Sequence, residues 1–164
     1  MIDVVARFQR LQQSGPLRRL YALVDGFQYE RHTGQQIEYR HGINRPVFAG
    51  TEDEPLAHAG PWLVDIEQAP EQVQPLHALE LALPSVSWLI TSVGLEGLSQ
   101  LLQLRLDAEM PDCRRALVRF YDPRVLGNLF QTMNAEQRAE FFHLIDEWHF
   151  MYKDRRVWAG RDDA

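Results

Sequence analysis

Residues 118–126 read VRFYDPRVL, a segment in which a strand is expected to turn directly into a helix. The apolar run 116–121 predicts the strand, with alternate side chains on opposite faces. Arg119 would be costly to bury there without a partner, so we expect a carboxylate beside it, with Asp25 as the first candidate. On this interpretation Arg119 is a structural residue, and an Arg119→Ala variant would lose thermal stability.

The second half of the segment carries the start signals of a helix. Asp122 can accept hydrogen bonds from the free backbone N–H groups of the first turn, and Pro123 has the backbone angle that an early helical residue needs. Arg124 then begins the helix. Asp25, Arg119, Asp122 and Pro123 are therefore predicted to support the fold.

Short apolar runs and helical patterns alternate along the rest of the chain. Predicted strands cover residues 20–24, 62–66, 86–91 and 148–152. Predicted helices cover residues 2–13, residues 74–83, residues 93–106 with Ser92 as N-cap, and a segment after the capping box of Asn134 and Gln137 that ends at Phe142 or Ile145. Residues 27–60 are polar and irregular, and predict one short helix at most.

This alternation predicts an α/β fold, with a mixed sheet of mostly short strands and helices packed on its faces. A length of 164 residues corresponds to one domain. No repeat or linker divides the sequence. We therefore expect a single compact domain over residues 1–164.

Charge and composition argue against several classes of protein. The net charge of −6 repels nucleic acid, and no run of basic residues opposes it locally. No apolar run is long enough to span a bilayer or to act as a signal peptide. Cys113 is the only cysteine, which excludes an intrachain disulfide. We expect a cytoplasmic protein that binds neither nucleic acid nor membrane.

Motifs with catalytic spacing are missing. The segment 94–97 has neither the spacing nor the lysine of a phosphate-binding loop, and no serine lies in a G-x-S-x-G elbow. Glu140 and His143 have the spacing of a metal-binding helix, but the second such pair that these sites need is absent. We predict no enzyme activity, metal, cofactor or small-molecule substrate.

Five motifs occur in a characteristic order between about residues 20 and 148. They are LYALVDG at 20–26, P-x-L-V at 61–64, W-x-x-x-S at 88–92, a leucine-rich helix, and RFYDPR at 119–124. The series resembles the family called domain of unknown function 4123, the adaptor chaperones of bacterial type VI secretion systems. The resemblance implies a non-catalytic protein that binds a secreted effector in the cytoplasm and helps load it onto the spike protein VgrG.

Aromatic side chains and arginines are the common anchors of protein interfaces, although tryptophan is also a frequent core residue. The residues predicted to contact a partner are Trp62, Trp88, Trp148, Trp158, Tyr121 and Arg124.

Two other functions remain open on the sequence. An enzyme could gather Asp25, His32 and Arg119 at strand ends, where α/β sheets often bind ligands. An immunity or regulatory protein could neutralise a toxin by binding it, which predicts inhibition of the effector rather than improved delivery.

Overall fold

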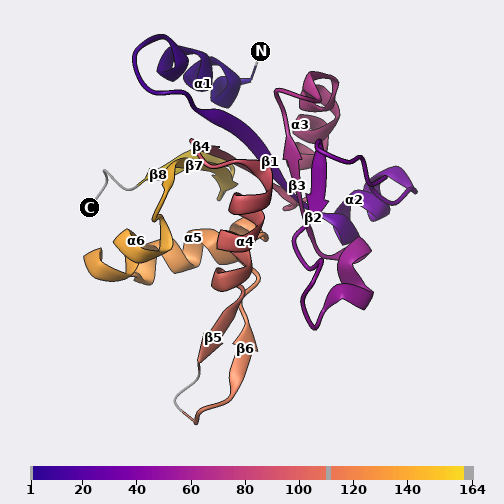
Figure 1. The fold of residues 1–164 in the computed structure, drawn as a ribbon, viewed down its shortest axis with the longest axis vertical. Helices are drawn as coiled ribbons and strands as arrows, with labels where there is room; N and C mark the ends of the chain where they lie inside the picture. The colour runs from indigo at the N-terminus through magenta and orange to yellow at the C-terminus, as the bar shows by residue number, and fades with distance from the viewer. Residues whose placement is uncertain (1, 110–111, 161–164) are drawn as a thin grey trace.

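The computed structural model of the chain describes residues 2–109 and 112–160. Figure 1 shows a sheet with helices around it and a two-stranded hairpin that projects away from the body. The strands are β1 (Arg19–Asp25), β2 (Asn44–Pro46), β3 (Pro61–Asp65), β4 (Val86–Thr91), β5 (Asp107–Glu109), β6 (Arg115–Leu117), β7 (Ile145–Tyr152) and β8 (Arg155–Gly160). The helices are α1 (Asp3–Gln13), α2 (Gly26–Thr33), α3 (Val73–Ala82), α4 (Leu95–Arg105), α5 (Pro123–Thr132) and α6 (Ala135–Phe141), with short 3-10 helices η1 (Glu54–Ala59) and η2 (Pro70–Gln72).

The main sheet has six strands in the order β2-β3-β1-β4-β7-β8. The α/β architecture with helices packed against the sheet is confirmed. Every neighbouring pair is antiparallel, however, so the sheet is not mixed. A parallel pair needs a crossover that carries the chain back to the end where the previous strand began. Here β1 and β2 run parallel, as do β3 and β4, so their connections do make that return. A further strand lies between the members of each pair, however, so every hydrogen-bonded neighbour is antiparallel.

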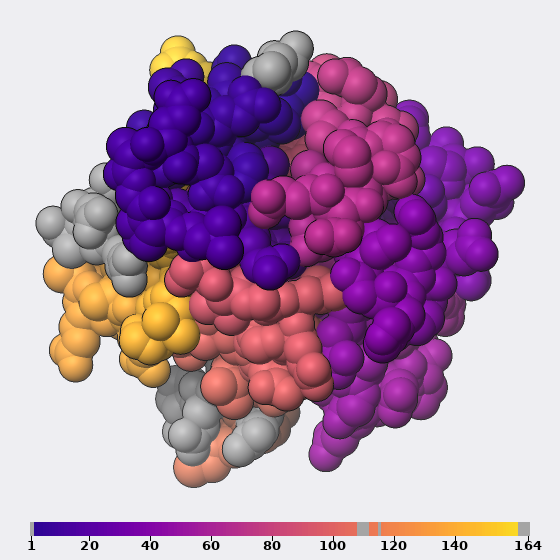
Figure 2. Space-filling view, turned by 45° about the horizontal axis from the view of Figure 1, so that its top comes forward, coloured from indigo at the N-terminus to yellow at the C-terminus, as the bar shows by residue number. Residues whose placement is uncertain are grey.

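Two apolar layers cover the two faces of this sheet. Along β1, Tyr21 and Leu23 point to one layer while Ala22 and Val24 point to the other, because successive strand residues alternate. The first layer, which we call the α4 face, includes residues of α4, α5 and α6. The second, the α1 face, includes residues of α1 and α3, which lie side by side in Figure 2. Covering on both sides explains why the centre of β1 is uniformly apolar.

The strand predicted over residues 116–121 is wrong beyond Leu117. β6 ends there and pairs only with β5, in the hairpin rather than in the main sheet. Phe120 and Tyr121 lie in the following turn, yet both side chains are buried in the α4 face. Phe120 meets the ring of Trp148 edge to face, with 5.7 Å between centroids. The apolar run at residues 120–121 therefore reflects two buried aromatic side chains in a turn rather than a strand.

Residues 27–60 are more ordered than expected, since they contain most of α2, β2 and η1. The prediction of at most one short helix was wrong. The polar sequence of this segment gives no local signal for these elements, because contacts with distant residues support them. Gly26 N donates to Gly60 O (2.8 Å), and Trp62 Nε1 donates to the carbonyl of His58 (3.3 Å).

Three boundary signals had different outcomes. The capping box of Asn134 and Gln137 is present at the start of α6, as predicted. Ser92 does not cap α4, which begins after Gly94. The last strand β8 was not predicted, because the turn before it consists of Lys153 and Asp154, both with positive φ but without the glycine that usually marks such hairpins.

Helix α1 is tied to the sheet by a buried carboxylate. Glu147 on β7 accepts hydrogen bonds from Arg7 Nε (2.9 Å) and Nη2 (2.5 Å), and its Oε2 lies 2.8 Å from His149 Nε2. Burial alone raises the pKa of Glu147, but the hydrogen bonds and charges of His149 and Arg7 outweigh it, so the pKa lies below its ordinary value. Ionised Glu147 therefore stabilises the folded chain.

This arrangement predicts a pH dependence of stability. Because the folded-state pKa of Glu147 is lowered, its stabilising effect is present above the unfolded-state pKa of about 4.3 and is lost as the pH falls through the folded-state value. A Glu147→Gln variant is expected to melt below the wild type at neutral pH, with a gap that narrows in acid. Thermal unfolding over a pH series measures this. A gap that stays constant into acid would contradict the assignment.

Candidate functional site

Residues from distant parts of the sequence line one open cavity of about 370 Å³, which we call the motif groove. It lies between the end of β1, the start of β3 and the turn from β6 to α5. Its polar and motif residues include Asp25, Gly60, Arg119, Tyr121, Asp122 and Arg124. The first and last of the sequence motifs thus meet at this groove, beside Gly60, the residue before the second motif.

One wall of the groove is the junction of β1 and α2. The carboxylate of Asp25 caps α2, accepting hydrogen bonds from Phe27 N (3.0 Å) and Gln28 N (3.3 Å). Gly26 has no space for a side chain, since a Cβ atom there would meet the carbonyl oxygens of His58 and Gly60. Asp25 and Gly26 are therefore the start of a helix packed closely on the chain before β3.

The opposite wall is the start of α5. Asp122 caps this helix by accepting from Arg124 N (2.9 Å), and Pro123 occupies its first turn, as the sequence predicted. The side chain of Arg124 folds back on the cap, with 2.8 Å between Nη2 and Asp122 Oδ2. Two carboxylates of the groove, Asp25 and Asp122, are thus engaged in helix caps.

The structure places Arg119 differently from the sequence interpretation. It lies after β6 rather than on a strand, it is exposed, and no carboxylate within the described ranges forms an ion pair with it. It does line the same cavity as Asp25. Burial raises the pKa of Asp25, and the nearby charge of Arg119 partly offsets that rise. The two groups therefore interact through space, but Arg119 keeps its hydrogen-bonding capacity.

The rim of the groove is apolar. Phe27 and Leu56 have 56% and 59% of their surface exposed there, which is unusual for side chains of this size. Tyr121 is buried beneath, with its ring 6.4 Å from that of Phe48 in an edge-to-face contact. Gln28 also lines the cavity, and its buried Oε1 has no hydrogen-bond partner among the described residues. Such a surface suits a peptide segment with both apolar and polar groups.

The proposed catalytic group of Asp25, His32 and Arg119 is not assembled. His32 lies near the opposite end of α2 and does not line the groove, whereas the other two do. The candidate enzyme site therefore lacks its histidine.

Most of the predicted tryptophan anchors lie in the core. Trp88 is fully buried in the α1 face, Trp148 is fully buried in the α4 face, and Trp62 is nearly fully buried. The indole N–H of each has an acceptor inside the protein. These three side chains lie inside the protein rather than on its surface. Trp158 is 43% exposed on β8, while Tyr121 and Arg124 line the motif groove.

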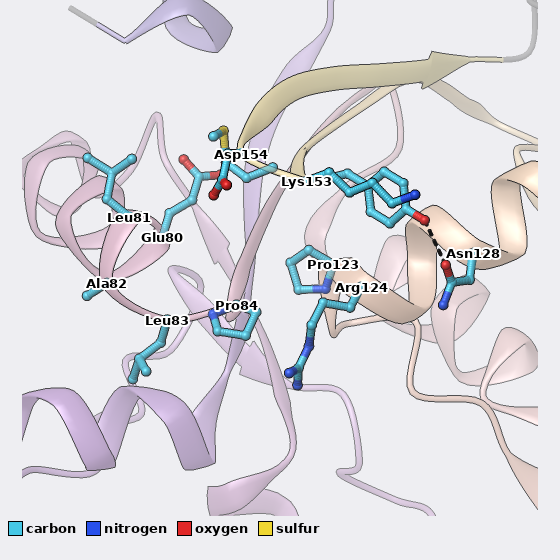
Figure 3. Close-up of a pocket in the computed structure, with 12 residues that line it drawn as sticks. Glu80, Leu81, Ala82, Leu83, Pro84, Pro123, Arg124, Asn128, Lys153 and Asp154 are labelled. Atoms are coloured by element: carbon cyan, nitrogen blue, oxygen red, sulfur yellow. Dashed lines mark hydrogen bonds between the residues drawn. The ribbon is translucent and has the colours of Figure 1, made fainter.

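A second cavity of about 680 Å³, which we call the α3–α5 cleft, borders the same turn. Figure 3 shows residues 81–84 on one side and Pro123, Arg124 and Asn128 on the other, with the β7–β8 turn closing the cleft. Tyr152 OH at the end of β7 donates to Asn128 Oδ1 on α5 (2.7 Å). Arg124 belongs to both cavities. The sequence carried no signal for this cleft, since its walls come from separate elements.

Residues 2–109 and 112–160 lack two kinds of feature. No group of histidine, cysteine, aspartate and glutamate side chains in these ranges is arranged to hold a metal ion. No helix in the same ranges combines the length and the apolar character that crossing a membrane requires.

Comparison with known proteins adds one finding. A family described as Domain of unknown function (DUF4123) matches residues 20–140, a range that contains every motif-groove residue named above. The resemblance inferred from the five motifs is thereby confirmed. Neither the curated proteins nor the solved structures compared with the chain include a match.

Proposed function

Because the chain belongs to the DUF4123 family, we propose that it is a cytoplasmic adaptor chaperone that binds a type VI secretion effector and helps load it onto the VgrG spike. The family as a whole is associated with such adaptors. The observation that carries the proposal is the convergence of two family motifs, at residues 20–26 and 119–124, on one open groove with an apolar rim.

The way in which the groove would bind an effector segment depends on which of its charged side chains already have partners. Asp25 and Asp122 cap helices, and Arg124 is bound to Asp122, so these side chains mainly hold the walls in place. Arg119 is exposed and has no ion pair among the described residues. An effector segment would place an apolar side chain against the rim and a carboxylate on Arg119, because guanidinium and carboxylate groups match in planar, bidentate geometry.

An Arg119→Ala variant tests this mechanism. We expect it to retain much less effector than the wild type while its melting temperature stays nearly unchanged, because an exposed side chain without an ion pair adds little to stability. Co-expression with candidate effectors of the same organism, co-purification and a secretion assay measure binding and delivery. Arg10→Ala is the matched control, since Arg10 is exposed on α1 and does not line the groove.

The outcomes separate the possible functions. Equal effector retention by Arg119→Ala and Arg10→Ala would exclude the groove as the docking site. If the wild-type chain retains neither effector nor spike protein and secretion is unchanged, the adaptor function is rejected. Inhibition of the effector's toxic activity without any change in its secretion would identify an immunity protein instead.

A further inference from the structure

The motif groove carries more negative than positive charge. Its lining contains three carboxylates and two guanidinium groups, which belong to Asp25, Asp53, Asp122, Arg119 and Arg124. Asp122 and Arg124 neutralise each other, with 2.8 Å between Oδ2 and Nη2. Two carboxylates then share the single guanidinium of Arg119, and neither of them forms an ion pair within the described ranges. The groove therefore lacks one positive charge.

Asp25 has one carboxylate oxygen that its helix cap does not use. The two backbone N–H groups of the cap, those of Phe27 (3.0 Å) and Gln28 (3.3 Å), both bind Oδ1. Oδ2 accepts no hydrogen bond from any residue that the structure describes, and it is not sealed inside the protein. Burial raises the pKa of this carboxyl group more than the cap lowers it, so its charge is incompletely compensated. Oδ2 is thus an acceptor open to a ligand.

A second unused polar group is buried in the same groove. Tyr121 has only 7% of its surface exposed, yet its hydroxyl makes no hydrogen bond to any residue of the described ranges. Burial raises the pKa of Tyr121, the charge of Arg119 lowers it, and nearby carboxylates, Asp25 first among them, raise it further. These influences place the hydroxyl end among the charged groups of the groove. Buried tyrosine hydroxyls usually have a partner, so this one points to a partner from outside the chain.

The mouth of the groove suits an aliphatic chain. Phe27, Leu56 and Leu117 come from three separate elements, and all three line the cavity with exposed side chains. Lysine lays its four-carbon chain along apolar surface and carries its charge at the tip. An apolar mouth above polar acceptors therefore matches a lysine side chain.

An arginine would match the acceptors less well. Its planar guanidinium binds a carboxylate best through both oxygens at once, and Oδ1 of Asp25 is already occupied by the two N–H groups of the cap. The ammonium group of lysine is a compact charge with three donors, each of which needs only a single acceptor atom. Asp25 Oδ2 and the Tyr121 hydroxyl are such acceptors.

We propose that the motif groove receives a lysine side chain of the effector segment, whose ammonium group binds Asp25 Oδ2 and the Tyr121 hydroxyl while its carbon chain packs on the apolar mouth. The inference rests on the proposed function, because it concerns the segment that the adaptor would bind. The lysine supplies the positive charge that the groove lacks. The effector segment would then carry one basic residue for Asp25 and one acidic residue for Arg119.

Two conservative substitutions test this site. Asp25→Asn removes the charge but keeps a cap for α2, because asparagine is as good an N-cap as aspartate. Tyr121→Phe removes only a hydroxyl that has no partner within the described ranges. With an effector that the wild type retains, calorimetric titration should give a Kd about tenfold higher for Asp25→Asn and about fivefold higher for Tyr121→Phe. Both melting temperatures should stay close to the wild type.

Tyr29→Phe is the matched control. Tyr29 lies on α2, does not line the motif groove, and has a hydroxyl without a hydrogen-bond partner among the described residues. This variant should bind the effector as tightly as the wild type does.

Chemical labelling identifies the lysine on the effector. One effector lysine that reacts with an acetylating N-hydroxysuccinimide ester in the free effector should be protected in the complex. Replacing that lysine with methionine should weaken binding, and Asp25→Asn should add little further loss to that effector variant, because the two changes remove the same contact. Protection of no lysine, or fully additive losses, overturns the inference.

The results separate this inference from the proposed function. If the wild type retains no effector, the adaptor function is rejected and the lysine site with it. If Arg119→Ala weakens binding while Asp25→Asn and Tyr121→Phe bind as tightly as Tyr29→Phe, the groove binds the effector and only the lysine site is overturned. Should Asp25→Asn not fold, Tyr121→Phe and the labelling experiment decide the question.

Discussion

Replacing Trp148 with alanine is expected to lower the free energy of unfolding by about 3–5 kcal/mol, the usual range for deleting a large buried aromatic side chain. Trp148 is fully buried on β7 and stacks parallel to Phe141, with 5.6 Å between ring centroids. The rings of Phe120 and Phe142 meet it edge to face at 5.7 and 6.1 Å. Alanine would leave a cavity among three aromatic rings that cannot move together without distorting the α4 face.

The alanine variant also loses a buried hydrogen bond. The indole N–H of Trp148 donates to Ser87 Oγ (2.9 Å), and that buried hydroxyl would lose its donor. Urea denaturation at neutral pH measures the change. Trp158→Ala is the matched control, since this partly exposed side chain is expected to cost less than about 1–2 kcal/mol. Equal losses for the two variants would show that Trp148 does not organise the α4 face.

The second large effect is expected at Glu80, where alanine should lower the free energy of unfolding by about 3 kcal/mol or more. Glu80 on α3 is buried in the α1 face and accepts hydrogen bonds from Trp88 Nε1 (2.9 Å) and from two nitrogens of Arg156 (2.7 and 2.6 Å). The Nδ1 atom of His77 lies 3.3 Å from it. Removing the carboxylate leaves the guanidinium of Arg156 and the buried indole N–H of Trp88 without their acceptor.

A double-mutant cycle separates this ion pair from simple loss of packing. Glu80→Ala, Arg156→Ala and the double variant are compared by urea denaturation, and the double variant should cost clearly less than the sum of the single variants. The reason is that removal of Arg156 also removes the unpaired buried charge. Additive losses would contradict the proposed coupling. Glu80→Gln, which keeps the shape and an acceptor for Trp88, is expected to cost less than Glu80→Ala.

Much of the fold was predictable where the signal is local. The apolar runs of β1, β3 and β4 are short and have at most one polar residue inside them, and their limits agree closely with the prediction. The caps at Asp122 and Asn134 depend on residues at most three positions apart, and both were correct. β8 follows a turn without glycine, and its Arg-rich start resembles a loop, so no local pattern marked it.

The candidate site shows the same division between local and distant signals. The motif at residues 119–124 marked the family, and it correctly directed attention to the start of α5. The predicted role of Arg119 was wrong. An arginine between apolar residues suggests a buried strand position, whereas Arg119 is exposed beside the groove. The sequence analysis did not identify Phe27 and Leu56 as rim residues, because the local sequence does not determine which apolar side chains are exposed.

The sequence by itself determined the family, the α/β class, the helix caps and the buried strands, since each depends on side chains close together in the chain. Only the tertiary structure decided that the sheet is antiparallel, that three tryptophans are core residues, and that Asp25 and Arg119 share a groove without an ion pair. The physical reason is that burial and pairing depend on which distant segments meet, and the sheet order, rather than any local pattern, brings those segments together.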